Sequence, residues 1–283
     1  MDVSIEVARE AGACFGVERA LDMAFEAAEK SSGPVHTLGP LIHNPVVVKA
    51  LEERGVTVVE TPGVGEGATL LLRTHGVTPE VEQAAQTSGA TVIDATCPFV
   101  KRVHRHAERL EAEGYQVVIV GEEGHPEVEG TLGHALSATV IGSAEEAAAL
   151  EVGHRVGLVV QTTQSESNLR AVVDAFVGRV DELRLFDTIC EATSTRQAAA
   201  ADLAERSDVM IVIGGRNSAN TTRLAEICAA RCPRTHHIET ADEIDKAWLE
   251  NAQRIGITAG ASTPQTFIKD VRATIARLVG EQS

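Results

Sequence analysis

The sequence TVIDATCPFVKRVHRHAERL, residues 91–110, joins a short apolar run to an amphipathic pattern through a single cysteine. Val92–Ile93 is β-branched and apolar, which favours a strand. After the cysteine, apolar residues recur at the spacing of one helix face: Val100, Val103, Ala107 and Leu110. Pro98 suits the first turn of that helix, where a missing N–H costs no hydrogen bond. The stretch therefore predicts a strand, a helix that begins at Pro98, and the thiol of Cys97 between them.

Two more cysteines stand in the same kind of place. Asp94-Ala-Thr-Cys97 is repeated as Asp187-Thr-Ile-Cys190 after another apolar run. Cys14 also precedes a helical pattern, and the three cysteines are almost evenly spaced along the chain. Chance similarity between ordinary βα units could produce part of this repeat. The chemical likeness of the repeated residues favours three related structural units.

Polar residues recur together with the cysteines. One set follows the three cysteines at nearly equal separations: His43, His125 and Ser218. A looser set stands where apolar runs end: His75, Thr162 with Thr163, and Ser262. Each third of the chain is therefore predicted to carry one cysteine at a helix start and two polar groups at strand ends.

Short Val/Ile/Leu runs alternate with amphipathic patterns along the whole chain, which is typical of α/β units with parallel strands. The expected strands include Val56–Val59, Leu70–Leu72, Val92–Ile93, Val117–Val120, Val156–Val160, Leu183–Phe186, Val209–Ile213 and Ile255–Thr258. We predict three small α/β domains with mostly parallel sheets in a pseudo-threefold arrangement: residues 14–96, residues 97–189, and residues 190–283 with 1–13. Because ligands of open parallel sheets bind at the C-terminal ends of strands, the repeated groups would meet in one central cavity.

Composition limits the classes of function. The 283 residues include 25 Lys and Arg against 41 Asp and Glu, a net charge of −16, and only 3% are aromatic, which argues against nucleic-acid binding. No secretory signal and no apolar run long enough for a membrane span are present in the sequence. An odd number of cysteines, five, favours reduced thiols over a disulphide framework. We expect a cytoplasmic protein that binds neither nucleic acid nor membranes.

Three thiolates at one point would form a soft metal site with an open position, suited to an iron-sulphur cluster or to zinc. Each cysteine alone could instead be a small buried apolar residue. A zinc hydrolase would use the same three thiolates, a bound water and Glu127 as base, whereas a non-catalytic anion-binding protein would have inert cysteines. Cys228 and Cys232 lie four residues apart on one helix, have no counterparts elsewhere, and are interpreted as core thiols.

The segment GEEGHPEVEG, residues 121–130, places His125 two residues before Glu127 after an apolar strand. A histidine can donate N–H groups to an anion, and a nearby carboxyl group can deliver a proton. Glu127 could equally be a solvated acid like the other glutamates of this segment. The stretches QTT (161–163), NSAN (217–220) and AGAS (259–262) resemble helix N-caps, and caps offer the same free N–H groups that bind anions.

A set of motifs, in order, resembles the iron-sulphur reductase family that acts on 4-hydroxy-3-methylbut-2-enyl diphosphate in the methylerythritol phosphate route to isoprenoids. The motifs are CFGVERA (14–20), LGPLIHN (38–44), THGV (74–77), DATCP (94–98), GHPEVEG (124–130), QTT (161–163), DTICEAT (187–193), NSAN (217–220) and TAGAS (258–262). The resemblance implies one 4Fe-4S cluster per chain, held by Cys14, Cys97 and Cys190. It also implies substrate-binding and catalytic positions.

By this resemblance, His43, His75, His125, Ser218, Asn220 and Ser262 surround the diphosphate of the substrate, and Thr193 belongs to the same pocket. Thr162 and Glu127 lie near the hydroxyl group, with Glu127 in the proton relay. The expected reaction is a two-electron reductive dehydroxylation to isopentenyl and dimethylallyl diphosphate. The sequence contains no Gly-x-Gly-x-x-Gly fingerprint, so an external donor of ferredoxin or flavodoxin type is expected to supply the electrons.

The chain departs from the family pattern at one position. Ala219 stands where the family usually has a second serine after Ser218. The missing hydrogen bond to a charged group would cost about 1.5–3 kcal/mol of binding free energy. A backbone N–H or Thr221 could compensate.

Overall fold

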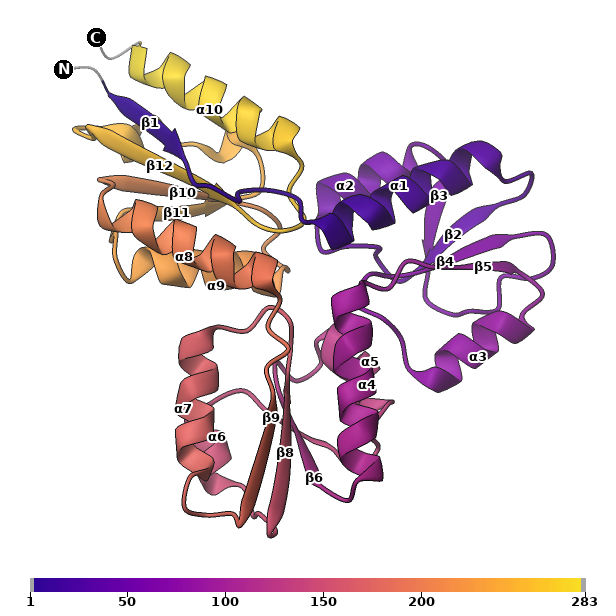
Figure 1. Ribbon diagram of the computed structural model, residues 1–283. Helices are drawn as coiled ribbons and strands as arrows, with labels where there is room; N and C mark the ends of the chain where they lie inside the picture. Colours follow the sequence, from indigo (N-terminus) through magenta and orange to yellow (C-terminus); the bar gives the residue numbers. More distant parts are fainter. Residues whose placement is uncertain (1–2, 281–283) are drawn as a thin grey trace. The chain divides into compact units, whose positions relative to one another are not determined.

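The computed structural model describes residues 3–280, which contain three four-stranded parallel sheets with helices between their strands (Figure 1). The predicted α/β class with parallel sheets is confirmed. The described residues form two compact units. Of the described residues, the first unit contains 3–15, 43–45 and 191–280, and the second contains Gly16–Ile42 and Val46–Cys190. The predicted domain limits at residues 96 and 189 remain a prediction.

The second unit contains two of the sheets. The first has the strand order β3 (Val56–Val59), β2 (Val35–Leu38), β4 (Thr69–Leu72) and β5 (Thr91–Asp94). Its helices are α1 (Phe15–Lys30), α2 (Pro45–Glu52) and α3 (Pro79–Thr87). Every residue of the central strand β4 is buried, as expected for a parallel strand that is covered on both faces.

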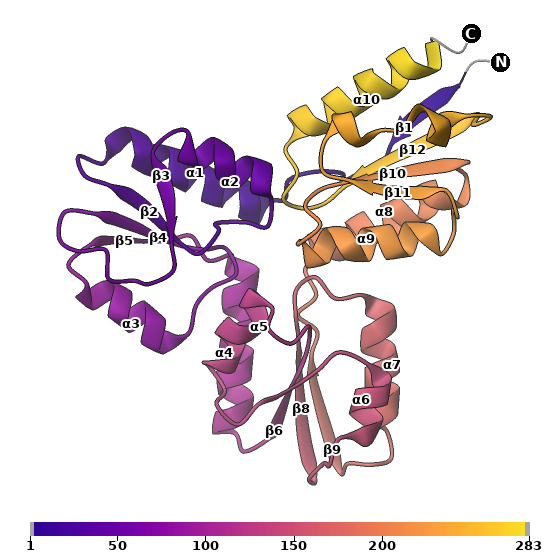
Figure 2. The same cartoon turned by 180° about the vertical axis from the view of Figure 1, so that it is seen from behind.

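The other sheet of this unit has the order β7 (Thr139–Ile141), β6 (Gln116–Val120), β8 (Arg155–Val160) and β9 (Glu182–Phe186). Helices α4 (Pro98–Ala112) and α5 (Pro126–Leu132) lie on one face, and α6 (Ala144–Ala149) and α7 (Glu166–Phe176) on the other (Figures 1 and 2). Helix α4 begins at Pro98, as the sequence predicts, and its buried residues include the four apolar positions named above.

The first unit contains the third sheet, with the order β1 (Ser4–Val7), β12 (Arg254–Ala259), β10 (Val209–Ile213) and β11 (Thr235–Ile238). Its helices are α8 (Glu191–Glu205), α9 (Ala219–Ala229) and α10 (Gln265–Gly280), with two short 3₁₀ helices, η1 (Ala241–Glu243) and η2 (Lys246–Leu249). Strand β1 pairs in parallel with β12, from Ser4 opposite Arg254 to Val7 opposite Ile257. The edge of this sheet is thus built from residues about 250 positions away in the chain.

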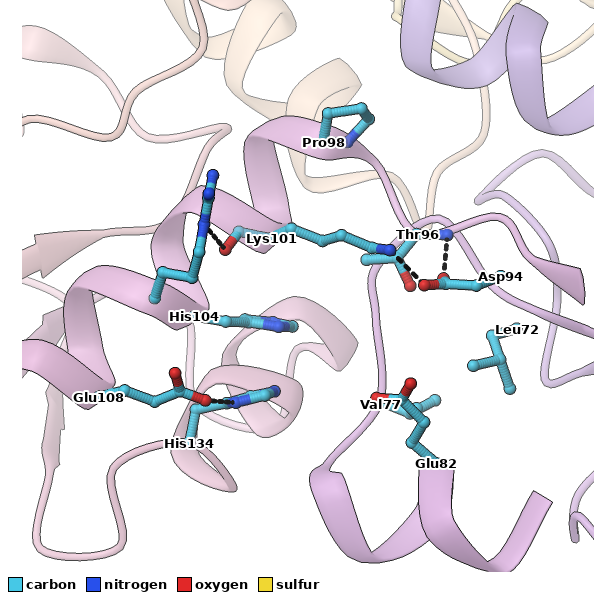
Figure 3. Close-up of a pocket in the computed structure, with 11 residues that line it drawn as sticks. Leu72, Val77, Glu82, Asp94, Thr96, Pro98, Lys101, His104, Glu108 and His134 are labelled. Atoms are coloured by element: carbon cyan, nitrogen blue, oxygen red, sulfur yellow. Dashed lines mark hydrogen bonds and ion pairs between the residues drawn. The ribbon is translucent and has the colours of Figure 1, made fainter. Parts of the chain in front are cut away.

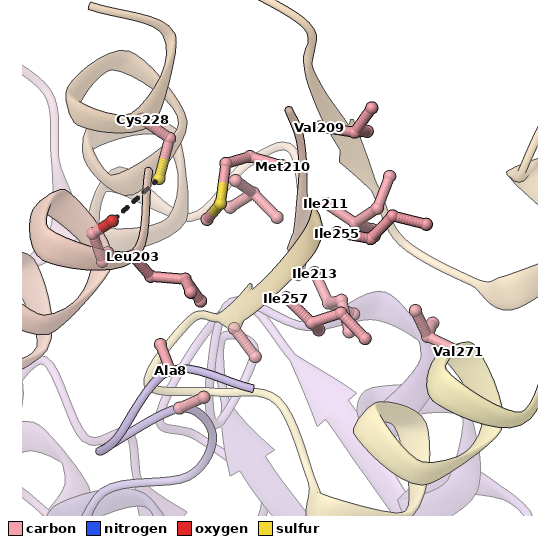
Figure 4. Packing of buried hydrophobic residues seen from close by; sticks show 14 of the residues in the cluster. Ala8, Leu203, Val209, Met210, Ile211, Ile213, Cys228, Ile255, Ile257 and Val271 are labelled. Carbon is pink, nitrogen blue, oxygen red and sulfur yellow. Dashed lines mark hydrogen bonds between the residues drawn. The ribbon is translucent and has the colours of Figure 1, made fainter. Parts of the chain in front are cut away.

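The core of the first unit packs β10 and β12 against α8, α9 and α10 (Figure 4). Cys228 is fully buried in it, and Cys232 is 2% exposed. The Cys228 thiol points towards the carbonyl oxygen of Ala200, at 3.9 Å, and burial raises the pKa of this thiol to about 12. Both residues are therefore core thiols, which confirms the interpretation from the sequence. No helix within residues 3–280 is long and apolar enough to cross a membrane.

Candidate functional site

The three candidate ligand cysteines share one backbone position. Each cysteine N–H donates to the carbonyl oxygen of the residue that lies two positions beyond the end of the neighbouring strand. The pairs are Cys97 with Thr74 (3.0 Å), Cys190 with Thr162 (3.1 Å) and Cys14 with Ala261 (3.1 Å). The repeat inferred from the sequence is therefore a repeat of backbone hydrogen bonding as well as of residue type.

A helix follows each of these cysteines directly. Cys97 is the N-cap residue of α4 and makes no side-chain capping hydrogen bond, while α1 and α8 begin at Phe15 and Glu191. All three thiols are partly exposed. The positive end of a helix dipole favours a thiolate, so these positions suit metal ligation.

Aspartates shape the loops before two of the cysteines. Asp94 Oδ1 accepts a hydrogen bond from the Thr96 N–H at 2.9 Å, and Asp187 Oδ1 accepts one from the Ile189 N–H at 3.1 Å. Burial disfavours the charged form of Asp94, but hydrogen bonds from Lys101 and Thr96 outweigh burial and lower its pKa. Both Asp-x-x-Cys motifs therefore build the same turn, which fixes where the following thiol lies.

No three His, Cys, Asp or Glu side chains within residues 3–280 are arranged to hold a metal ion. Cys14 belongs to the first unit, and Cys97 and Cys190 belong to the second. We therefore describe the groups of each unit separately.

Glu127 and Thr162 form a buried pair in the second unit. Glu127 lies in the first turn of α5 and is 2% exposed, and Thr162 follows the end of β8. The Thr162 N–H donates to Glu127 Oε1 at 2.6 Å, and its hydroxyl donates to Oε2 at 2.7 Å. Burial raises the pKa of Glu127 to about 7, although both hydrogen bonds from Thr162 oppose this shift. The carboxyl group can therefore hold a proton near neutral pH, as a general acid requires.

Two histidines adjoin this pair. His125 is the N-cap residue of α5, and its Nδ1 accepts a hydrogen bond from the Glu127 N–H at 3.1 Å, which leaves the ring proton of the neutral form on Nε2. The rings of His75 and His125 meet edge to face, with centroids 5.7 Å apart. Gly130 of α5 packs against the backbone of residues 75–77. The second unit thus brings together four predicted residues: Glu127, Thr162, His75 and His125.

These four residues are linked to both cysteines of the second unit. Thr162, which binds the carboxylate, also accepts the hydrogen bond of Cys190. Thr74, which accepts the hydrogen bond of Cys97, is the residue before His75. Hydrogen bonds therefore join Glu127 and Thr162 to the backbone of Cys190, and the loop that carries His75 to the backbone of Cys97.

A buried histidine supports the loop of residues 74–76 from behind, and sequence reasoning missed it. A Cβ atom added to Gly76, whose φ is +76°, would lie 2.7 Å from Cε1 of His104. The His104 ring stacks on the His134 ring, with centroids 4.1 Å apart. It lines a cavity of about 370 Å³ behind the Cys97 loop (Figure 3). Burial, with His134 as a smaller cause, lowers the pKa of His104 to about 3, so it stays neutral and acts as packing.

The first unit groups further predicted residues. The Ser262 hydroxyl donates to the His43 carbonyl oxygen at 3.1 Å, and the Asn44 amide donates to the Ser262 carbonyl oxygen at 2.8 Å. Ser218 is the N-cap residue of α9 and accepts a hydrogen bond from the Thr221 N–H at 3.4 Å. Asn44, which the sequence analysis did not select, thus fixes the loop that carries Ser262.

Asn220 is the clearest sign of a ligand site in this unit. It is 4% exposed, and neither its amide nitrogen nor its amide oxygen has a hydrogen-bond partner within the described residues. A buried amide without partners is costly, and a bound polar ligand would satisfy it. The Thr221 hydroxyl is fully buried, lies close to Gly214 and Gly260, and likewise has no hydrogen-bond partner within the described residues. Thr193 is buried in the first turn of α8.

Comparison with known proteins relates nearly the whole chain to one family. A family model described as LytB protein matches residues 5–276. The 4-hydroxy-3-methylbut-2-enyl diphosphate reductase of Geobacter metallireducens is 51% identical over 270 residues, which cover 95% of this chain and 95% of that protein. The enzyme of the same name from Geotalea daltonii is 48% identical over 283 residues, with 99% and 100% covered.

Two solved structures are also similar. One is the (E)-4-hydroxy-3-methyl-but-2-enyl diphosphate reductase described as the terminal enzyme of the non-mevalonate pathway. It shares 46% identity and a TM-score of 0.72, with 97% of this chain and 99% of that chain covered. The other is the corresponding reductase of Plasmodium falciparum, with 26% identity, a TM-score of 0.91, and coverage of 98% and 88%.

Proposed function

Because the chain belongs to the LytB protein family, we propose that it reduces 4-hydroxy-3-methylbut-2-enyl diphosphate to isopentenyl and dimethylallyl diphosphate. The allylic C–O bond breaks, two electrons and two protons are consumed, and the hydroxyl group leaves as water. The observation that carries the proposal is the Glu127–Thr162 pair, a protonatable carboxyl group beside the Cys190 loop.

We propose Cys14, Cys97 and Cys190 as the ligands of one 4Fe-4S cluster. Support comes from their shared backbone position at helix starts and from their partial exposure. When bound, such a cluster supplies electrons one at a time and an iron that acts as a Lewis acid towards the substrate oxygen. The proposal requires Cys14 to join the two thiols of the second unit. Cysteines that must stay reduced in order to bind a cluster are consistent with a cytoplasmic location.

The chain's own residues would deliver the proton. Protonated Glu127 donates through the Thr162 hydroxyl, which binds both the carboxylate and the departing oxygen of the substrate. The short Thr162–Glu127 hydrogen bonds hold the carboxyl group in place before the substrate arrives. The burial that raises the pKa of Glu127 also limits access of bulk water to the acid.

The remaining polar groups would bind the diphosphate. We assign this role to His43, His75, His125, Ser218, Asn220 and Ser262, with Thr193 nearby. Because the net charge is −16, binding of an anion depends on such local donors and on the N–H groups of α9 behind Ser218. The unpartnered amide of Asn220 supports a polar ligand at this place.

Metal analysis after anaerobic purification tests the proposal. We expect about four irons and four acid-labile sulphides per chain, together with turnover of the substrate by reduced methyl viologen. Cys97→Ser should lose iron, whereas the matched core variant Cys228→Ala should retain it. One zinc per chain would instead indicate the zinc hydrolase, and a metal-free, inactive protein would leave the anion-binding alternative.

A further inference from the structure

One face of α4 carries three arginines and a histidine in a strongly acidic protein. Arg102, Arg105, His106 and Arg109 recur at the spacing of one helix face. The ring of His106 stacks on Phe186 of β9, with centroids 4.0 Å apart, and Arg184 of β9 lies over the same Phe186 ring at 5.1 Å. We call these four arginines the α4–β9 basic stripe: Arg102, Arg105, Arg109 and Arg184.

All four arginines of the stripe lie close enough to His106 for their charges to act on it. Burial lowers the pKa of His106, and the charges of all four arginines of the stripe lower it further. Two carboxylates lie near the β9 end of the stripe: Glu113 pairs with Arg109 at 2.7 Å and also with Arg184, and Glu182, which pairs with Arg155 at 2.9 Å, also interacts with the charge of Arg184. Within residues 3–280, no ion pair involves Arg102 or Arg105. The stripe therefore keeps a positive excess.

The acidic residues of α4 have other partners. Glu108 binds His134 at 2.5 Å, and Glu111 accepts two hydrogen bonds from Ser137, each 2.7 Å long. Arg105 lines the same cavity as Glu108, Glu82 and Asp94, whereas no acidic residue of α4 stands three or four positions from Arg102.

Both elements of the stripe lead directly to proposed cluster ligands. Helix α4 begins immediately after Cys97, and β9 ends four residues before Cys190. With a rise of about 1.5 Å per residue, Arg102 lies roughly 8 Å and Arg109 roughly 18 Å along the helix from Cys97. Electron transfer weakens steeply with distance, so a donor bound here would be well placed.

We propose that the α4–β9 basic stripe is the docking surface for a small acidic electron carrier of ferredoxin type, an inference that rests on the proposed function. Two encounters per turnover each oxidise one reduced carrier and deliver one electron, and the two electrons leave with the reduced substrate. The overall charge of −16 repels an acidic carrier, so a local positive stripe determines where it binds. Guanidinium groups bind carboxylates in a bidentate manner, and the His106–Phe186 stack provides a flat, less polar centre.

The test compares two sources of electrons. Arg102→Glu/Arg105→Glu is assayed with a reduced 2Fe-2S ferredoxin and with reduced methyl viologen, which needs no docking surface. The matched control, Arg170→Glu/Arg272→Glu, changes two exposed helical arginines elsewhere by the same charge. We expect the KM for ferredoxin to rise about tenfold or more only in the stripe variant, with weaker dependence on salt. Viologen-driven turnover should stay within about twofold of the wild type in both.

An unchanged KM for ferredoxin in the stripe variant, or an equal rise in the control, overturns the docking inference. A wild-type protein that viologen cannot drive overturns the proposed function instead. If charge reversal prevents folding, Arg102→Gln/Arg105→Gln removes the positive charges without adding negative ones. Its KM for ferredoxin should also rise, by less than that of the reversal variant.

Discussion

Replacement of Glu127 by glutamine tests the acid directly, because the amide keeps the shape of the carboxyl group but cannot donate its proton. With a pKa of about 7, the protonated fraction of Glu127 falls from about one half at pH 7 to about 1% at pH 9. If protonated Glu127 is required, kcat/KM should fall about fiftyfold over this range in the wild type. The variant should retain iron, show a strongly reduced rate, and lose this decline with pH.

The same substitution has a calculable effect on stability. A rise of the pKa from 4.5 to about 7 means that ionisation of Glu127 destabilises the folded state relative to the unfolded state. This cost is absent below about pH 4.5, grows as the pH rises, and reaches about 3 kcal/mol above pH 7. Glu127→Gln should therefore stabilise the protein by up to about 3 kcal/mol at pH 8 and by much less at pH 5.

The measurements are viologen-driven initial rates from pH 6 to pH 9 and urea unfolding at pH 5 and pH 8. Substrate and product are quantified by mass spectrometry, and iron content is determined for each sample. A variant with a nearly normal rate, or one that keeps the decline above pH 7, would remove Glu127 from the proton relay. A stability difference independent of pH would refute the assigned cause of its raised pKa.

Three further outcomes follow from contacts of the described residues. Gly76→Ala places a Cβ atom 2.7 Å from the ring of buried His104 at φ +76°, whereas Gly178→Ala, at φ +79°, meets no atom within 4 Å. Gly76→Ala should therefore lower the free energy of unfolding by about 1–3 kcal/mol more than Gly178→Ala, and equal losses in urea unfolding would show that the His104 ring moves aside. Thr162→Val removes a hydroxyl donor to Glu127, so kcat should fall at least about tenfold. The decline of kcat/KM with pH should also move to higher pH, and a decline at the same pH as in the wild type would contradict this coupling. Asn220→Leu should raise the KM for the substrate about tenfold without loss of iron or stability, because its amide has no partner within residues 3–280; an unchanged KM would remove it from the diphosphate site.

Most of the predicted strands are runs of apolar residues. Val117–Val120 and Val209–Ile213 are also rich in β-branched residues and fully buried, as parallel strands covered on both faces require. Four strands were missed: β1, β2, β7 and β11. They are three or four residues long, and β2 and β11 contain polar residues in the sequences VHTL and THHI. Their pairing with apolar neighbours, which a local pattern does not record, makes them strands.

The site shows the same division between local and tertiary information. The position of Cys97 at a helix start was readable from Pro98 and the apolar spacing beyond it. Glu127 could not be separated from neighbouring glutamates, because its burial depends on Thr162, 35 positions away. His104 was missed for a related reason, since its role comes from the close approach of Gly76. Repeats identify equivalent positions, but burial and protonation depend on the assembled fold.

The pairing of β1 with β12 affects the order in which the parts of the protein can fold during synthesis. Ser4–Val7 leaves the ribosome early, but its partner strand Arg254–Ala259 is synthesised almost last. The hydrogen bond from the Cys14 N–H to the carbonyl oxygen of Ala261 can therefore form only after nearly the whole chain has been translated. The sheets of the second unit can form meanwhile, because all their strands lie between residues 35 and 186. Under the proposed function, iron delivery to all three thiols is consequently a step that follows synthesis of the chain.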